Sequence, residues 1–252
     1  MTDYLLVHGA GQGAWAWGRV WGYLTAPEQH PPPLDRPRRV NQVCALDLPG
    51  HGANDGGRAA QAGVEECVQA VVQAAQSRGL RQLVLVGHSF AAPLLLQAAG
   101  HLTPPPKRLV LVAGIVPGPQ DPMLKVFPRP TRMAFHTLAA LSWLTRQPLK
   151  LPRLAISRYV CNGVAPMEVA QVVGRFGPLP VRVLKTPLGL GEIKPPCPVT
   201  YVVLTQDRVA PPQLQRRMAQ RIPGVEIIEL ESDHQPMLHR PRELAQLLLR
   251  YA

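Results

Sequence analysis

The 252-residue sequence lacks several features that would commit it to a specialised class of protein. Its four cysteines (Cys44, Cys67, Cys161 and Cys197) form no CxxC pair and have no histidine at metal-ligand spacing, and no HExxH motif occurs. We therefore expect reduced thiols, no metal site and no cofactor. No apolar run is long enough to span a membrane, and the start MTDYLLVHGAG lacks the basic region and apolar core of a signal peptide. These absences predict a cytoplasmic protein with no membrane partner.

Acidic residues are scarce as well, with 16 Asp and Glu against 27 Lys and Arg, a net charge of +11. Positions 117–194 hold eleven basic and three acidic residues, so a net 8 of these charges fall there. No nucleic-acid-binding motif accompanies them, and we expect no nucleic-acid partner. A solvated basic surface is the favoured interpretation, and a preference for anionic substrates near this segment is the alternative.

Short apolar runs alternate with amphipathic segments, which is typical of a parallel sheet whose strands are joined by crossover helices. The expected strands are 4–7, 40–46, 83–86, 109–112, 200–204 and 226–230. The expected helices are 15–24, 64–77, 90–99, 212–221 and 241–251. A proline-rich stretch, 26–39, is expected to form an exposed loop.

A long segment, 116–196, separates the fourth and fifth expected strands by far more than one crossover requires. Apolar helical pieces at 133–144 and 167–173 are interrupted by prolines. The predicted fold is therefore an α/β core (1–115 and 197–252) with a mainly parallel six-stranded sheet, and a helical lid (116–196) inserted after the fourth strand.

The clearest chemical motif is Gly87-His88-Ser89-Phe90-Ala91, which joins an apolar strand to a helix. A nucleophile elbow requires this arrangement, because a tight turn between strand and helix exposes the serine hydroxyl. Small residues two positions on either side of Ser89 permit close packing, with Ala91 in place of the second glycine of G-x-S-x-G. Ser89 is the predicted nucleophile.

Further along the chain, an acid and a histidine follow the last two expected strands, in the order Ser, Asp, His. Asp207 and His234 are the predicted members of the triad, because the carboxyl ends of parallel strands meet at one edge of the sheet. Asp121 and His239 are the alternatives. Asp233 is adjacent to His234 in the chain and is expected to point elsewhere.

A third motif, His8-Gly9-Ala10-Gly11-Gln12-Gly13-Ala14-Trp15, follows the first strand. Its glycine spacing also fits a dinucleotide-binding turn, and the next strand ends at Asp47. Asp47 lies 33 residues after Ala14, however, beyond the usual distance of about 20. As part of a hydrolase, the turn would supply the amide of Ala10, which with the amide of Phe90 would form an oxyanion hole.

The stretches HGAGQGAWAW, ALDLPGHG, GHSFA, TQDRVAP and SDHQPMLHRPRELAQLL resemble, in order, the α/β-hydrolase branch that contains plant methyl esterases and hydroxynitrile lyases. The resemblance implies Ser89, Asp207 and His234 as the triad, with Ala10 and Phe90 as amide donors. It also suggests a shortened member that lacks the first two strands. The lyases carry a hydroxyl residue after the first histidine and a Lys after the catalytic histidine, where this chain has Gly9 and Gln235.

The combined prediction is a serine carboxylesterase that cleaves a small to medium apolar or aromatic ester, as a monomer or homodimer. The alternatives are a lactonase, a hydroxynitrile-lyase-like enzyme, a non-catalytic ligand-binding protein and a dinucleotide-dependent oxidoreductase. Candidate substrate-pocket residues lie beside the triad motifs: His8, Gly9, Trp15, His88 and Gln235.

Overall fold

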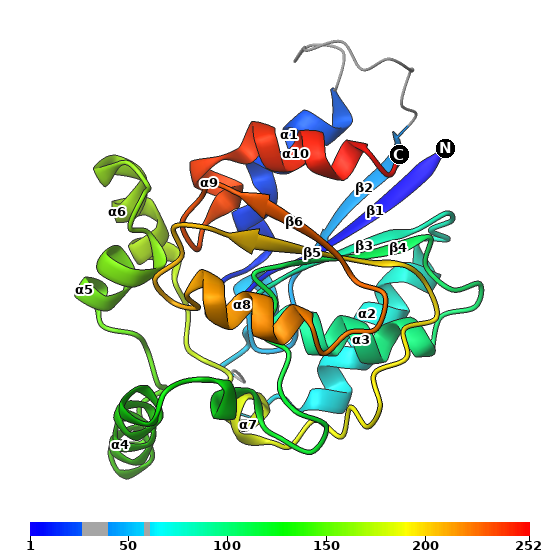
Figure 1. The fold of residues 1–252 in the computed structure, drawn as a ribbon. Helices are drawn as coiled ribbons and strands as arrows, with labels where there is room; N and C mark the ends of the chain where they lie inside the picture. Colours follow the sequence, from blue (N-terminus) through cyan, green and yellow to red (C-terminus); the bar gives the residue numbers. More distant parts are fainter. Residues whose placement is uncertain (27–39, 58–60) are drawn as a thin grey trace.

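The computed structural model describes residues 1–26, 40–57 and 61–252. At its centre is a six-stranded sheet in which all neighbouring strands are parallel, in the order β2-β1-β3-β4-β5-β6 (Figure 1). The strands are β1 (Thr2–Val7), β2 (Val40–Leu46), β3 (Val84–His88), β4 (Arg108–Val112), β5 (Val199–Leu204) and β6 (Glu226–Leu230). The predicted α/β fold is confirmed. Nearly all of the predicted 26–39 loop lies outside the described residues.

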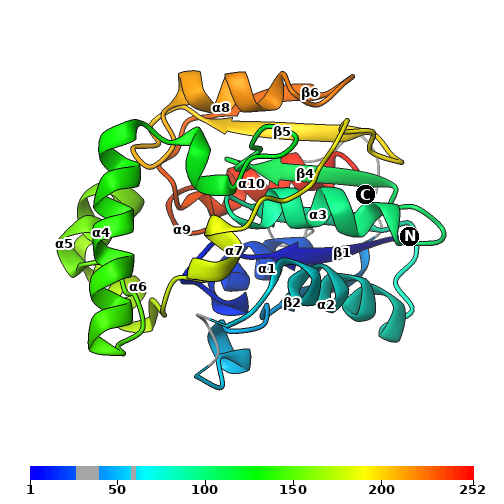
Figure 2. The same ribbon diagram turned by 90° about the horizontal axis from the view of Figure 1, so that it is seen from below.

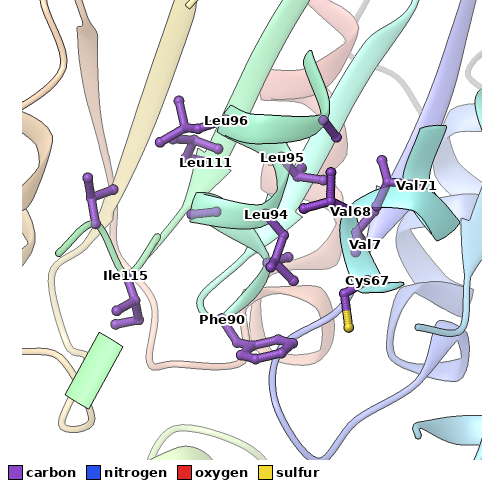
Figure 3. Packing of buried hydrophobic residues seen from close by; sticks show 14 of the residues in the cluster. Val7, Cys67, Val68, Val71, Phe90, Leu94, Leu95, Leu96, Leu111 and Ile115 are labelled. Atoms are coloured by element: carbon purple, nitrogen blue, oxygen red, sulfur yellow. The ribbon is translucent and has the colours of Figure 1, made fainter. Parts of the chain in front are cut away.

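Helices cover both faces of the sheet. On one face lie α1 (Gly18–Thr25) and α10 (Pro241–Leu249), and on the other lie α2 (Val64–Ser77), α3 (Ala91–Gly100) and α8 (Pro212–Ala219) (Figure 1). The alternation of side chains along each strand produces two cores: Leu5 and Val7 pack with the α2–α3 side, whereas Tyr4 and Leu6 pack with the α1–α10 side. Figure 3 shows side chains of the first of these cores on and around α3, with Phe90 at its edge.

Between β4 and β5 the chain forms a separate group of short elements. These are η4 (Met123–Val126), α4 (Arg129–Thr145), α5 (Arg153–Ala155), the π-helical turn η5 (Ile156–Val160), α6 (Pro166–Arg175) and α7 (Val181–Lys185). Figure 2 shows α4, α5 and α6 beyond the carboxyl ends of the strands. Pro130 and Pro166 stand in the first turns of α4 and α6, where a missing N–H costs little. The prolines thus begin helices as well as separate them.

Candidate active site

Ser89 occupies a strained turn between β3 and α3. Its φ of +51° lies in the left-handed region that side chains other than glycine rarely adopt, at a cost of about 1 to 3 kcal/mol. The turn is held from both sides: the Ser89 amide donates to the Val112 carbonyl at 2.9 Å, and the Ser89 carbonyl accepts from the Ile115 amide at 2.9 Å. A side chain at Gly87 would meet Leu95 Cδ1 at 2.5 Å, so only glycine lets α3 approach β3 this closely. The local geometry is that of a nucleophile elbow.

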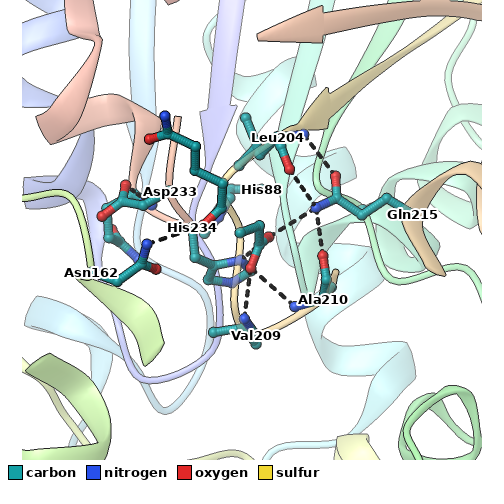
Figure 4. A network of polar contacts seen from close by, with 12 residues as sticks. His88, Asn162, Leu204, Val209, Ala210, Gln215, Asp233 and His234 are labelled. Atoms are coloured by element: carbon teal, nitrogen blue, oxygen red, sulfur yellow. Dashed lines mark hydrogen bonds and ion pairs between the residues drawn. The ribbon is translucent and has the colours of Figure 1, made fainter. Parts of the chain in front are cut away.

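Asp207 and His234 meet although they come from different loops. His234 Nδ1 lies 2.7 Å from Asp207 Oδ2, and both residues are buried (Figure 4). The other carboxylate oxygen, Oδ1, accepts hydrogen bonds from the amides of Val209 at 2.7 Å and Ala210 at 3.0 Å. An ionised Asp207 can only accept a hydrogen bond, so Nδ1 of the neutral ring carries the proton and Nε2 keeps its lone pair.

His88 connects the elbow to this pair. Its ring lies against that of His234, with the centroids 4.7 Å apart, and His88 directly precedes Ser89 in the chain. Burial is the main cause that holds the pKa of His88 well below its usual value, with a further contribution from the neighbouring His234. His88 is therefore neutral, and its uncharged ring packs against one side of the His234 ring.

Gln215, on α8, was not anticipated from the sequence. It is fully buried, and its Nε2 donates to Asp207 Oδ2 at 3.0 Å and to the Ala210 carbonyl at 2.6 Å. Its Oε1 accepts from the Leu204 amide at 2.9 Å. One amide side chain thus holds both the Asp207 carboxylate and the loop that carries it (Figure 4).

Gln12, in the glycine-rich turn that follows β1 (residues 8–15), was also not predicted from the sequence. It is buried, and its Oε1 accepts from the Gly9 amide at 3.1 Å while its Nε2 donates to Gln235 Oε1 at 2.6 Å. Gln12 therefore ties the turn that contains Ala10 to the residue that follows His234. No local pattern could have indicated this bond, because its partners are 223 positions apart.

The candidate pocket residue His8 instead holds the turn in place. Its Nε2 accepts from the Leu48 amide at 3.1 Å, and its Nδ1 lies 2.8 Å from the Gly9 carbonyl. Burial, with a smaller contribution from His51, lowers the pKa of His8 from 6.5 to about 3. Both ring nitrogens of this wholly buried side chain are engaged by backbone groups.

Two amides of the turn that would face a dinucleotide phosphate already have acceptors. Asp47 Oδ1 accepts from the Ala14 amide at 2.6 Å, and Gln12 occupies the Gly9 amide. Space is also limited, because a side chain at Gly9 would meet His88 Nδ1 at 2.7 Å. These contacts weigh against the dinucleotide interpretation and leave no room at position 9 for the hydroxyl residue of the lyases.

The alternative acid and histidine face other partners. Asp121 forms an ion pair with Lys125 at 2.6 Å. The Asp233 amide donates to His239 Nδ1 at 3.2 Å, while the Asp233 carboxylate accepts from the amides of Gly163 at 2.8 Å and Gln235 at 2.9 Å. Asp233 therefore joins the His234 loop to the inserted segment.

The inserted segment also contacts the glycine-rich turn that follows β1 (residues 8–15). The Gly177 amide donates to the Gly11 carbonyl at 2.7 Å, and any side chain at Gly11 would overlap the ring of Phe176. The Arg175 guanidinium lies over the Trp15 ring, 4.7 Å from its centroid. Trp15 thus contacts the insertion, next to the turn that carries Ala10.

A model of the alpha/beta hydrolase family matches residues 4–247. The chain belongs to this family. Its curated relatives are esterases: Methylesterase 9 of Arabidopsis thaliana is 27% identical over 270 residues, covering 100% of this chain and 98% of the relative. Probable esterase PIR7A of Oryza sativa is 28% identical over 271 residues, covering 99% and 96%.

Solved structures of the alpha/beta hydrolase fold superpose over the whole chain. An extracellular alpha/beta-hydrolase from a Paenibacillus species has a TM-score of 0.85 at 19% identity, covering 100% of this chain and 99% of its own. The pyrethroid hydrolase PytH has a TM-score of 0.72 at 24% identity, covering 99% and 96%. Within the described ranges, no cluster of His, Cys, Asp and Glu could hold a metal ion, and no helix is long and apolar enough to cross a bilayer.

Proposed function

We propose that the protein is a serine carboxylesterase with Ser89 as nucleophile, His234 as general base and Asp207 as the acid that orients His234. The bond between His234 and Asp207 carries the proposal, because it leaves Nε2 of a buried neutral imidazole free to take a proton. The strained elbow at Ser89 provides the matching nucleophile.

In this mechanism Ser89 Oγ attacks the ester carbonyl while His234 Nε2 takes its proton. The amides of Ala10 and Phe90 stabilise the oxyanion, helped by the positive end of α3. His234 then protonates the departing alcohol, and water repeats the sequence to release the acid. Relatives named methylesterases support an ester substrate with a small alcohol, and the expected acyl group is apolar or aromatic.

A lyase reaction on the same residues is the second candidate, and two contacts disfavour it. Position 9 has no room for a hydroxyl side chain, and the neutral Gln235 amide, held by Gln12, stands where the lyases place a Lys. A departing cyanide would therefore lack a cationic partner.

The test combines a model ester with an active-site label. We expect Ser89→Ala to lower hydrolysis of p-nitrophenyl acetate by about 10⁴-fold or more and to abolish labelling by a fluorophosphonate probe. Asp207→Asn should cause a comparable loss because the imidazole adopts the wrong tautomer, whereas Asp121→Asn is the matched control and should be nearly neutral. Hydrolysis by Ser89→Ala at the wild-type rate would refute the proposal.

A further inference from the structure

The insertion between β4 and β5 exposes an unusual amount of apolar surface. Of the ten large hydrophobic side chains that are exposed in the described chain, seven lie between positions 133 and 167. We refer to them as the α4–α6 surface: Met133, Leu141, Trp143, Leu144, Leu154, Tyr159 and Met167. Trp143 is 82% exposed and Leu144 is 73% exposed. Exposed apolar residues on a protein surface are normally single and scattered, whereas these are concentrated in one segment of the chain.

The charge of the same stretch is entirely of one sign. Positions 129–158 contain six Lys and Arg and no Asp or Glu: Arg129, Arg132, Arg146, Lys150, Arg153 and Arg158. Ion pairs within the described residues neutralise none of the six. A hollow of about 440 Å³ beside the first turns of α4 is lined by Arg129 and Arg132 and adds Lys185 to this basic surface. Lys125, which also lines it, is paired with Asp121.

These two properties together select the kind of partner. A second copy of the chain docking through a two-fold axis would place this unpaired positive charge against itself, which is unfavourable. A partner that carries negative charge over an apolar layer satisfies both the cations and the exposed Trp and Leu side chains. A bilayer containing anionic phospholipid has this composition, with headgroup charge outside and acyl chains beneath.

We propose that the α4–α6 surface docks the protein on membranes that contain anionic phospholipid. The apolar side chains enter the boundary between headgroups and acyl chains, and the surrounding cations contact lipid phosphates. Figures 1 and 2 both place α4, α5 and α6 on the side of the molecule where the strands end. Docking therefore directs the candidate active site toward the bilayer. It requires no spanning helix, and it departs from the expectation of no membrane partner.

The test measures binding without reference to catalysis, so its result is independent of the esterase proposal. Purified protein is sedimented with vesicles of phosphatidylcholine alone or of phosphatidylcholine mixed with phosphatidylglycerol. We expect binding to the mixed vesicles that weakens at high salt, with a blue shift of tryptophan emission as Trp143 leaves water. Trp143→Phe should bind and lose the shift, because Trp17 is buried and the exposed Trp21 lies on α1, outside the α4–α6 surface.

Two sets of variants separate the apolar from the charged contribution. Trp143→Ser with Leu144→Ser, and Arg129→Gln with Arg132→Gln and Arg146→Gln, should each weaken vesicle binding by about tenfold or more. The matched controls, Ile227→Ser on β6 and Arg78→Gln with Arg217→Gln and Arg242→Gln, remove exposed groups elsewhere and should bind nearly as well as wild type. Thermal unfolding verifies that each variant is folded.

Several outcomes would overturn the proposal. These are absence of binding, equal binding to neutral and mixed vesicles, or controls that weaken binding as much as the α4–α6 variants. A dimer in solution that Trp143→Ser dissociates, without vesicle binding by wild type, would assign the surface to a second copy of the chain instead.

Discussion

At the scale of single residues, two buried glutamines position the site as much as the residues expected to react. Gln215 binds the Asp207 carboxylate, and Gln12 bridges the Gly9 amide to the Gln235 side chain. Each amide side chain donates and accepts at once, so one residue can fix two loops with opposite hydrogen-bonding needs. Replacing either residue by an apolar one would leave its buried partners unsatisfied, at a cost of about 1 to 3 kcal/mol for each group.

Gln12 offers a direct test of this positioning role. If Gln12 aligns the Ala10 amide with the developing oxyanion, Gln12→Ala should lower kcat by about tenfold to a hundredfold and leave KM nearly unchanged. Gln206→Ala, which removes an exposed side chain bonded to Glu231, is the control and should retain wild-type kinetics. A lower melting temperature is expected in either case, and a folded Gln12→Ala variant that kept its full kcat would show that Gln12 has only a structural role.

Ser89, Asp207 and His234 could be proposed from the sequence because each follows a recognisable apolar strand. Their order along the chain, Ser, Asp and then His, also matches the order of the triad in this fold. The glutamines could not be found in this way. Gln12 and Gln235 are brought together only when β1 and β6 occupy the same sheet, and glutamine has no local pattern that signals a buried bridge. Residues that position other residues are visible only in three dimensions.

At the scale of elements, all six strands were predicted to within two residues at each end, because buried parallel strands consist of short apolar runs. The first helix was less accurate: the expected 15–24 helix begins as the 3-10 turn η1 (Ala14–Trp17) before α1. In the insertion, α4 begins four residues earlier than the apolar pattern indicated. Its first turn contains basic and polar residues, so the spacing of apolar residues does not reveal where the helix begins.

The contact between the glycine turn and the insertion can be measured by a double-mutant cycle. Gly11→Ala should destabilise the protein, because its φ of +72° disfavours a side chain and its Cβ would overlap the Phe176 ring. Phe176→Ala removes the ring, so the double variant should be less destabilised than the sum of the single variants. Urea unfolding of the three variants gives the coupling free energy.

Gly174→Ala is the matched control for this cycle. It lies in α6, and nothing within 4 Å would meet its Cβ, so alanine should be neutral or stabilising by about 0.4 to 1 kcal/mol. If the destabilisations by Gly11→Ala and Phe176→Ala were strictly additive, the Phe176 ring and the Gly11 turn would not be energetically coupled.

At the scale of the whole molecule, buried histidines should make stability depend on pH. Burial lowers the pKa of His8 to about 3, and it also lowers the pKa values of His51 and His88. Below pH 6.5 the unfolded chain binds protons on these rings while the native protein does not. Their contribution to stability is therefore complete above about pH 6.5 and is lost as the pH falls toward 3.

Urea unfolding at several pH values checks this dependence. We expect the free energy of unfolding to fall between pH 7 and 5 with a slope of up to about 1.4 kcal/mol per pH unit for each ring. Between pH 7 and 8, where the three rings are mostly neutral in both states, it should change much less. A free energy of unfolding that stays level or rises on going from pH 7 to 5 would contradict the prediction.

The insertion leaves the sheet after β4 and returns at β5, and these two strands are direct neighbours, with Leu109 paired to Val199. Because the two strands are parallel, the segment leaves at the carboxyl end of β4 and returns at the opposite edge of the sheet, at the start of β5. Recombination between related genes could exchange the whole segment without altering the order of the strands, provided that the incoming segment also spanned the sheet. Such an exchange would succeed only where the incoming segment kept a ring to fill the space above Gly11 and a backbone amide to meet Asp233. New substrate preferences could then evolve by replacing this one segment, while the sheet and the proposed triad were inherited intact.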